Sequence, residues 1–317
     1  MDQNSTFYPS HVFKYEACPQ ALLWHKGWGT IDLGRGPGRG KKLPELSSRH
    51  HAVMGIAIQY AIEKMYNDEL YRDPHHLRFR LVELAENEFR RQELKPRNHI
   101  DYSEARMSRT EMLEIVRDGV LGYISTMKHH RFLGNEYAKA EVNLVGWVNK
   151  WVSVGGRADM IIRRTDTGIT ILDGKNTKHK MKYVDPDQLR WYAMCFKLAY
   201  RVMPDRLGFV WYRFPYGMET LDEEKDELVV EQGVEWVDFT EDDLRGLAQR
   251  AIEAREGMRK EQFDPAPSPP NCKWCDFESV CEARQSQRAA NAAKRGPSKR
   301  NIKEISETGG FVDLSLG

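Results

Sequence analysis

The segment GGRADMIIRRTDTGITILDGK, residues 155–175, decides the fold that the sequence predicts. Two isoleucine-rich runs flank the turn-forming TDTG, a pattern that predicts a β-hairpin. Asp159 lies near the start of the segment, and Asp173 and Lys175 lie at its end. Residues two apart on a strand project from the same face, so Asp173 and Lys175 point the same way, and Asp159 comes opposite when the hairpin closes. The segment is either a solvated hairpin or a metal site.

A metal site in this hairpin would consist of oxygen ligands. The carboxylates of Asp159 and Asp173, together with the backbone carbonyl of Gly174, would form a hard site suited to Mg²⁺ or Mn²⁺. Gly174 also lets a ligand approach the backbone closely. Such an ion lowers the pKa of a bound water and neutralises phosphate charge, and Lys175 could orient that water. The spacing alone is a weak signal, and on that evidence a solvated hairpin is the commoner case.

The pattern around the hairpin predicts a mixed α/β fold. Helical periodicity precedes residue 137, and β-branched and aromatic residues follow it. The predicted helices cover residues 15–24, 47–66, 76–94, 103–131, 185–202 and 241–262, and the predicted strands cover 140–154, 157–164, 168–175, 206–214 and 233–240. This order predicts a mixed central sheet flanked by helices rather than a doubly wound sheet.

Further polar residues fall where they can reach the two acids. Gln188 and Tyr192 stand at i and i+4 on the helix that follows the hairpin, so they share one face. Glu141 opens the first strand of the meander. Gln59 forms a stripe at i, i+4 and i+8 with Gly55 and Glu63 on the helix predicted for residues 47–66.

Together these residues resemble the PD-(D/E)XK nuclease superfamily, specifically its RecB-like exonucleases. The chain contains, in order, G-x-x-x-(H)-x-x-x-E, E, G-x-x-D, D-x-K and Q-x-x-x-Y, with glutamine in the place of the histidine. The resemblance implies a restriction-endonuclease-like fold in which two acids bind the metal ion and a lysine completes the catalytic core. It also implies that a glutamate flanks the site and that a glutamine and a tyrosine contact DNA or support the site. In this sequence these residues are Asp159, Asp173, Lys175, Glu141, Gln188 and Tyr192.

The chain departs from the family pattern at Gln59. The family usually has a metal-binding histidine one turn after its first glycine, and Gln59 occupies that position here. We expect Gln59 to be a weaker metal ligand than an imidazole, which leaves the number of metal ions, one or two, open. His50 and His51 lie two turns earlier on the same helix and are not expected to replace it.

Four cysteines predict a second site. The segment NCKWCDFESVC contains Cys272, Cys275 and Cys281 in the spacing C-x2-C-x5-C. Three thiolates need a fourth to complete a tetrahedral or cubane site, and Cys18, followed by proline, is the natural candidate. Cys195 lies within an amphipathic helix and is expected to be a buried core thiol. Spacing alone does not separate zinc from iron–sulfur.

The same resemblance favours the iron–sulfur cluster over zinc. An N-terminal Cys-Pro followed by C-x2-C-x5-C after the nuclease motifs looks like the [4Fe–4S] staple of AddB-type and CRISPR-associated RecB-like nucleases. The match runs from Cys18 to Cys281. It implies a structural cluster that ties the terminal helices together, and structural Zn²⁺ is the alternative. Metal binding of this kind contributes directly to folding free energy.

Composition places the chain among ordinary globular proteins. It has 317 residues, 30% of them charged, and a formal net charge of +1. It lacks a secretory signal pattern and any apolar run long enough for a membrane span, so we expect a cytoplasmic protein. We expect one domain over residues 1–283, with a helical block at 44–135 and the nuclease core at 137–240. The basic residues 284–317 are predicted to form a disordered tail, although such a run also suits a phosphate backbone.

The resemblance implies a metal-dependent DNA exonuclease that acts on DNA ends or single strands in recombination, repair or CRISPR-type DNA processing. Gln59 motivates the alternative of a catalytically weak or inactive nuclease fold that serves as a DNA-binding scaffold. The intact set of Asp159, Asp173 and Lys175 argues against that alternative. The sequence has no G-x-x-x-x-G-K-[ST] motif, so any unwinding of DNA would come from a helicase or recombination partner.

Overall fold

The fold is that of a computed structural model, which describes two compact units. The first comprises residues 1–12 and 42–260, and the second comprises residues 13–41 and 261–317. The described residues are 6–26, 49–95, 98, 100–132, 137–177, 180, 185–222, 227–273, 275 and 277–295. None of the helices in these ranges has the length and apolar character needed to cross a membrane. The expectation of one domain over residues 1–283 stays a prediction.

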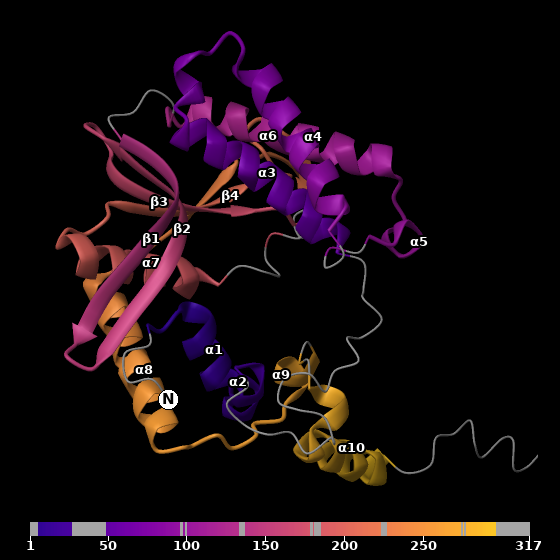
Figure 1. The fold of residues 1–317 in the computed structure, drawn as a ribbon, viewed down its shortest axis with the longest axis vertical. Coiled ribbons are helices and arrows are strands. Elements are labelled where there is room, and N and C mark those ends of the chain that lie inside the picture. The colour runs from indigo at the N-terminus through magenta and orange to yellow at the C-terminus, as the bar shows by residue number, and fades with distance from the viewer. Residues whose placement is uncertain are drawn as a thin grey trace, which may run out of the picture. The chain divides into compact units, whose positions relative to one another are not determined.

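A five-stranded mixed sheet forms the centre of the first unit (Figure 1). Its strands, in spatial order, are β1 (Tyr137–Asn149), β2 (Val152–Arg164), β3 (Gly168–Lys175), β4 (Arg206–Trp211) and β7 (Val234–Val237). Only β3 and β4 are parallel, and the other neighbours are antiparallel. Parallel neighbours need a crossover connection, which helix α7 (Pro186–Tyr200) supplies here. The predicted mixed sheet is confirmed.

Three helices cover one side of this sheet (Figure 1). They are α3 (His50–Asn67), α4 (Leu77–Glu93) and α6 (Arg109–His129). Their apolar faces and the sheet share one buried core, which includes Ile58, Phe89 and Tyr123 from the helices and Met160 and Leu172 from the strands. Burial of each such side chain contributes about 1.5–3 kcal/mol. This core fixes α3 against the strands that carry the acids.

Helix α7 and helix α8 (Glu241–Arg259) pack together on the other side of the sheet (Figure 1). The indole of Trp191 is fully buried and donates a hydrogen bond of 3.0 Å to the carbonyl oxygen of Gly155. Cys195 is also buried, which confirms the expected core role of this thiol. These contacts fix the orientation of α7, and so of Gln188 and Tyr192, relative to β2.

The second unit joins segments from the two ends of the chain. Helix α1 (Pro9–Ala17) begins in the first unit and ends in the second, and it is followed by α2 (Pro19–His25), α9 (Pro269–Lys273) and α10 (Glu282–Arg295). The ring of Trp24 meets the ring of Phe277 edge-on, and the side-chain amide of Asn271 donates to the carbonyl oxygen of Ala17.

The structure corrects the predicted elements in four places. The strand predicted over residues 140–154 is divided between β1 and β2, because a turn at residues 150–151, in which the side-chain oxygen of Asn149 accepts hydrogen bonds from the backbone N–H groups of Trp151 and Val152, separates them. Helix α5 (Tyr102–Ala105) and helix α6 replace the single helix predicted over residues 103–131. A hairpin of β5 (Glu219–Asp222) and β6 (Glu227–Val230) was missed, because exposed apolar residues on both strands remove the inside–outside alternation that predicts a strand. Helix α10 occupies the start of the predicted disordered tail, since alanine, arginine and glutamine favour helix there. Residues 296–317 of that tail lie outside the described residues.

The break before α6 has a local cause. Arg106 adopts a left-handed backbone with φ of 52°, which ends α5. The side chain of Ser108 then accepts a hydrogen bond from the backbone N–H of Glu111, and the Glu111 carboxylate accepts one from the backbone N–H of Ser108. This capping box starts a new helix.

Replacing Ser108 with alanine should lower the free energy of unfolding by about 1 kcal/mol, because it removes the oxygen that caps α6. Urea denaturation of the full chain measures the change. Thr110→Ala, which removes an exposed hydroxyl from the same turn and leaves the capping box intact, is the matched control. Equal unfolding midpoints for the two variants would contradict the role assigned to the cap.

Candidate active site

Three acidic side chains lie at one level of the sheet. The residue pairs on either side of Glu141 and Asp159 are in register between β1 and β2, so these two residues lie across from each other. Asp159 precedes Met160 in β2 and Asp173 follows Leu172 in β3, and these two neighbours are in register with each other. The two acids therefore lie next to one another at the end of the paired region. Glu141 has a left-handed φ of 55°, which distorts β1 at this point. The sheet therefore brings the acids of three neighbouring strands into one row.

Gly174 connects two of these strands. Its backbone N–H donates a hydrogen bond of 2.9 Å to Oδ2 of Asp159. A Cβ atom at this position would lie 1.7 Å from the hydroxyl oxygen of Tyr212, so the buried ring of Tyr212 excludes any side chain here. The sequence predicted that a ligand could approach the backbone at Gly174. In the structure the side chain of Tyr212 occupies the space beside Gly174 instead. The role of the Gly174 carbonyl as a metal ligand stays a prediction.

Lys175, Asp173, Gln188 and Tyr192 form one connected network. Nζ of Lys175 lies 2.6 Å from Oδ2 of Asp173 and donates a hydrogen bond of 2.9 Å to Oε1 of Gln188. The amide nitrogen of Gln188 lies 2.9 Å from Oδ1 of Asp173 and 3.1 Å from the hydroxyl of Tyr192. The structure thus brings together the strand and helix residues that the i, i+4 spacing and the D-x-K spacing predicted.

Gln59 and Glu141 meet on the α3 side of the row. The amide nitrogen of Gln59 donates a hydrogen bond of 3.1 Å to Oε1 of Glu141. Nε of Arg157 lies 2.6 Å from Oε2 of Glu141, and the hydroxyl of Tyr212 lies 2.6 Å from Oε1 of Gln59. Sequence analysis missed both Arg157 and Tyr212. Arg157 stands two residues from Asp159, so strand alternation could have indicated it, but no local pattern singles out Tyr212.

Burial and charge both act on the acids. Burial raises the pKa of Asp159 well above its usual range, and the charge of Asp173 raises it further. Burial also raises the pKa of Asp173, and the neighbouring Lys175 ammonium opposes that effect. Two carboxylates that lose water and face one another resist full ionisation unless a cation compensates them.

The carboxylate oxygens of this row are suited to a hard divalent cation. Oδ2 of Asp173 is buried and pairs with the ammonium of Lys175 at 2.6 Å. Carboxylate oxygens of this kind are preferred ligands of Mg²⁺ and Mn²⁺. Within the described ranges, however, no three His, Cys, Asp or Glu side chains are grouped as a ready-made metal site. Arg157 and Lys175 hold Glu141 and Asp173 to separate partners, so a cation would compete with these ion pairs.

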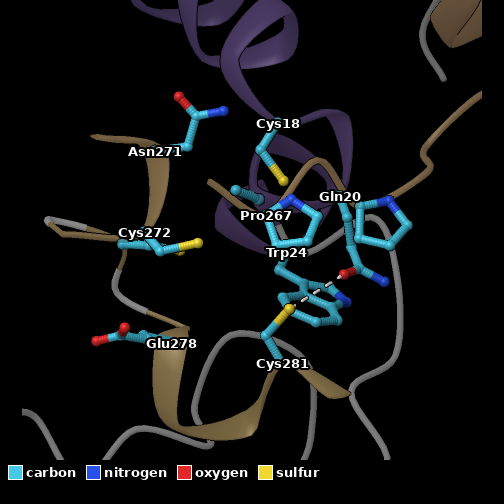
Figure 2. Close-up of a pocket in the computed structure, with 11 residues that line it drawn as sticks. Cys18, Gln20, Trp24, Pro267, Asn271, Cys272, Glu278 and Cys281 are labelled. Atoms are coloured by element: carbon cyan, nitrogen blue, oxygen red, sulfur yellow. Dashed lines mark hydrogen bonds between the residues drawn. The ribbon is translucent and has the colours of Figure 1, made fainter. Parts of the chain in front are cut away.

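The four predicted cysteine ligands line one small pocket within the second unit. Cys18, Cys272, Cys275 and Cys281 are all free thiols. Figure 2 shows the sulfur atoms of Cys18, Cys272 and Cys281 directed toward the space between them. Burial raises the pKa of Cys275, and the charges of the other three cysteines add to that effect. A backbone N–H, from Ala266, donates to Sγ of Cys18 at 3.4 Å.

The family model of the PD-(D/E)XK nuclease superfamily matches residues 6–282, which include the acids, the lysine and all four pocket cysteines. The chain belongs to this superfamily. No curated protein matches the sequence. A solved structure, "Crystal structure of SSO0001", is 16% identical with a TM-score of 0.32, and the match covers 58% of this chain and 76% of that chain. A likeness of that extent adds nothing to the superfamily assignment.

Members of the PD-(D/E)XK superfamily are nucleases, so the row of acids lies in a chain of a nuclease superfamily. The structure places Asp159, Asp173, Lys175, Gln188 and Tyr192 around one point of the sheet. Glu141 lies in the same row, and Gln59 reaches it from α3. The individual catalytic and metal-binding roles of these residues stay predictions.

Replacing Gly174 with alanine should lower the free energy of unfolding by about 1–3 kcal/mol, because the added methyl group cannot fit beside the buried Tyr212. Urea denaturation is the measurement. Gly246→Ala in α8 is the matched control: a Cβ there meets nothing within 4 Å, and alanine should stabilise the helix by about 0.5–1 kcal/mol. A Gly174→Ala variant as stable as the wild type would show that Tyr212 has room to move.

Proposed function

We propose that this protein is a metal-dependent deoxyribonuclease that removes nucleotides from DNA ends or single strands, that is, an exonuclease. One observation carries the proposal: Asp159, Asp173 and Lys175 adjoin on neighbouring strands in a chain of the PD-(D/E)XK superfamily. In the reaction, water attacks the phosphorus atom of a phosphodiester, and the bond from phosphorus to the leaving oxygen breaks. A bound Mg²⁺ or Mn²⁺ would supply charge neutralisation and acidify the water.

The residues around that cation have separate tasks in this proposal. Asp159 and Asp173 hold the ion through their carboxylate oxygens. The ammonium of Lys175 is fixed by Asp173 and Gln188. An ammonium held in this way can orient the attacking water by a hydrogen bond to its oxygen, or donate a hydrogen bond to a charged phosphate oxygen, without reorganising during the reaction. Gln188 also holds Oδ1 of Asp173, so it supports the ion-binding carboxylate directly.

DNA is the proposed substrate and partner. Tyr192 lies beside Gln188 on α7, where its hydroxyl can contact a strand that enters the site. Contacts to the phosphate backbone carry little sequence information, so we expect weak sequence preference. Recombination or repair is the pathway proposed, with CRISPR-type DNA processing as a more specific setting. Any unwinding of duplex DNA would come from a helicase or recombination partner.

We further propose that the cysteine pocket holds a structural [4Fe–4S] cluster, with structural Zn²⁺ as the alternative. Four free thiols line one pocket, and both kinds of site take four cysteine ligands. In the described part of the chain no three of them are grouped closely enough to form a metal site, so a bound metal would have to draw them together. The second unit also needs a staple, since its only buried side chains among the described residues are Leu22, Cys272 and Cys281. A unit with so small an apolar core depends on cross-links for stability. The RecB-like resemblance favours iron over zinc.

Asp173→Asn and Lys175→Met should each lower the rate of DNA hydrolysis about 100-fold or more, because each removes charge that stabilises the transition state. The assay follows 5′- and 3′-labelled single strands and duplexes with Mg²⁺ or Mn²⁺. Asp166→Asn, in the exposed turn of the same hairpin, and Lys197→Met, on α7, are matched controls expected to retain activity.

Circular single-stranded DNA separates the modes of cleavage, since an exonuclease leaves it intact. Binding of DNA by the wild type without hydrolysis under any divalent cation would instead support the scaffold alternative. Equal hydrolysis by the wild type and both site variants would overturn the assigned site.

Anaerobically purified protein should contain iron and acid-labile sulfide and absorb broadly in the visible range. Cys281→Ser should lose both the colour and the stability of the second unit, because three thiolates leave one iron without its protein ligand. Cys195→Ala is the matched control, since this buried thiol lies in α7 of the first unit. A colourless protein with one bound zinc would favour the zinc alternative.

A further inference from the structure

Gln59 is held between two partners that determine which way its amide faces. The hydroxyl of Tyr212 lies 2.6 Å from Oε1 of Gln59, and Nε2 of Gln59 lies 3.1 Å from Oε1 of Glu141. The other oxygen of Glu141 pairs with Nε of Arg157 at 2.6 Å. The result is a chain of contacts from Tyr212, directly after strand β4, through helix α3 to strand β1.

The groups that can donate hydrogen bonds determine which way the Gln59 amide faces. An ionised carboxylate only accepts hydrogen bonds, so the NH₂ group of Gln59 must face Glu141. Oε1 of Gln59 then faces Tyr212, whose hydroxyl donates to it. The group that Gln59 directs toward the row of acids is therefore a donor, and an amide N–H does not bind a metal ion. Its single oxygen, the only atom that could bind one, faces Tyr212 instead of Glu141.

Tyr212 has little freedom to release that oxygen. It is 2% exposed, its backbone N–H donates to the carbonyl oxygen of Lys175 at 3.0 Å, and its ring packs edge-on against Tyr123 with 5.8 Å between centroids. Its hydroxyl fills the space that a side chain at Gly174 would take. The position of this hydroxyl is thus set by β3, β4 and α6, independently of any bound ion.

We propose that Gln59 is a positioning residue for Glu141 rather than a metal ligand, and that Tyr212 sets its orientation. The inference rests on the proposed function in one respect, that the cation binds among Glu141, Asp159 and Asp173. Gln59, which Tyr212 orients, holds one oxygen of Glu141, and Arg157 holds the other, so the carboxylate stays level with Asp159. This arrangement reassigns Gln59, which the sequence comparison with the family histidine placed among the ligands.

Manganese affinity tests the inference without reference to hydrolysis. Free Mn²⁺ is measured by electron paramagnetic resonance during titration of the full-length protein. Gln59→Ala and Tyr212→Phe should each weaken binding about ten-fold, as loss of an outer-shell partner does. In the Glu141→Gln background Gln59→Ala should have no further effect, and in the Gln59→Ala background Tyr212→Phe should have none.

Tyr66→Phe is the matched control, because it removes another buried tyrosine hydroxyl that hydrogen-bonds a side chain, here Tyr123, outside the row of acids. It should leave manganese affinity unchanged, and circular dichroism confirms that each variant is folded. A full ten-fold loss from Gln59→Ala in the Glu141→Gln background would show that Gln59 binds the ion directly and would overturn the inference. Tyr212→Phe with wild-type affinity would overturn the role of Tyr212.

The wild type and Asp173→Asn separate this inference from the function on which it rests. Manganese binding by the wild type that Asp173→Asn abolishes supports the proposed site, and the variants above then decide the role of Gln59. A wild-type protein that binds no Mn²⁺ overturns the proposed function and this inference together.

Discussion

Two carboxylates that share a largely buried position, Asp159 and Asp173, are the constraint around which the first unit is arranged. Burial raises the pKa of each, the charge of Asp173 raises the pKa of Asp159 further, and the charge of Glu141 raises the pKa of both. Their neighbours offset the penalty of burial. Lys175 supplies a positive charge, Gln188 supplies an amide donor and Gly174 supplies a backbone donor. A buried carboxylate that lost its partners would destabilise the fold strongly, so the site and the fold are difficult to separate.

Close packing behind the acids makes their geometry rigid. Tyr212 occupies the space beside Gly174, and the same side chain determines the orientation of Gln59 on α3. Protein interiors filled in this way transmit small displacements instead of absorbing them. The core shared by α3, α4, α6 and the sheet thus contributes to the site, even though none of its apolar residues carries the chemistry.

The second unit depends on a different stabilising force. Its described residues bury few side chains, and two of those are cysteines of the pocket. The hydrogen bond from Asn271 to Ala17 and the contact of Trp24 with Phe277 add polar and aromatic contacts, but these are few. A bound cluster or zinc ion would therefore account for a large part of the folding free energy of this unit. The first unit has an extensive apolar core and needs no such staple.

The sequence by itself determined the mixed sheet, most helices, the pairing of Asp159 with Asp173 and the Gln188–Tyr192 face. These follow from periods of two and 3.6 residues, which are local properties of the chain. It also predicted the cysteines that line the pocket: the spacing of Cys272, Cys275 and Cys281 is a local signal, and Cys18 was inferred from the need for a fourth thiolate. It failed at α5 and at the β5–β6 hairpin, where capping or exposed apolar residues outweighed periodicity. It also failed at the turn between β1 and β2, and at α10, where helix-favouring residues form a helix in a segment predicted to be disordered.

Only the tertiary structure decided what surrounds the acids. Tyr212 lies 153 residues from Gln59 in the sequence, and no local pattern relates the two. The orientation of the Gln59 amide depends on the hydroxyl of Tyr212, which follows β4, at one end and on the carboxylate of Glu141 in β1 at the other. Sequence spacing predicts which residues share a face, whereas the direction of a hydrogen bond depends on partners that only the folded chain brings together.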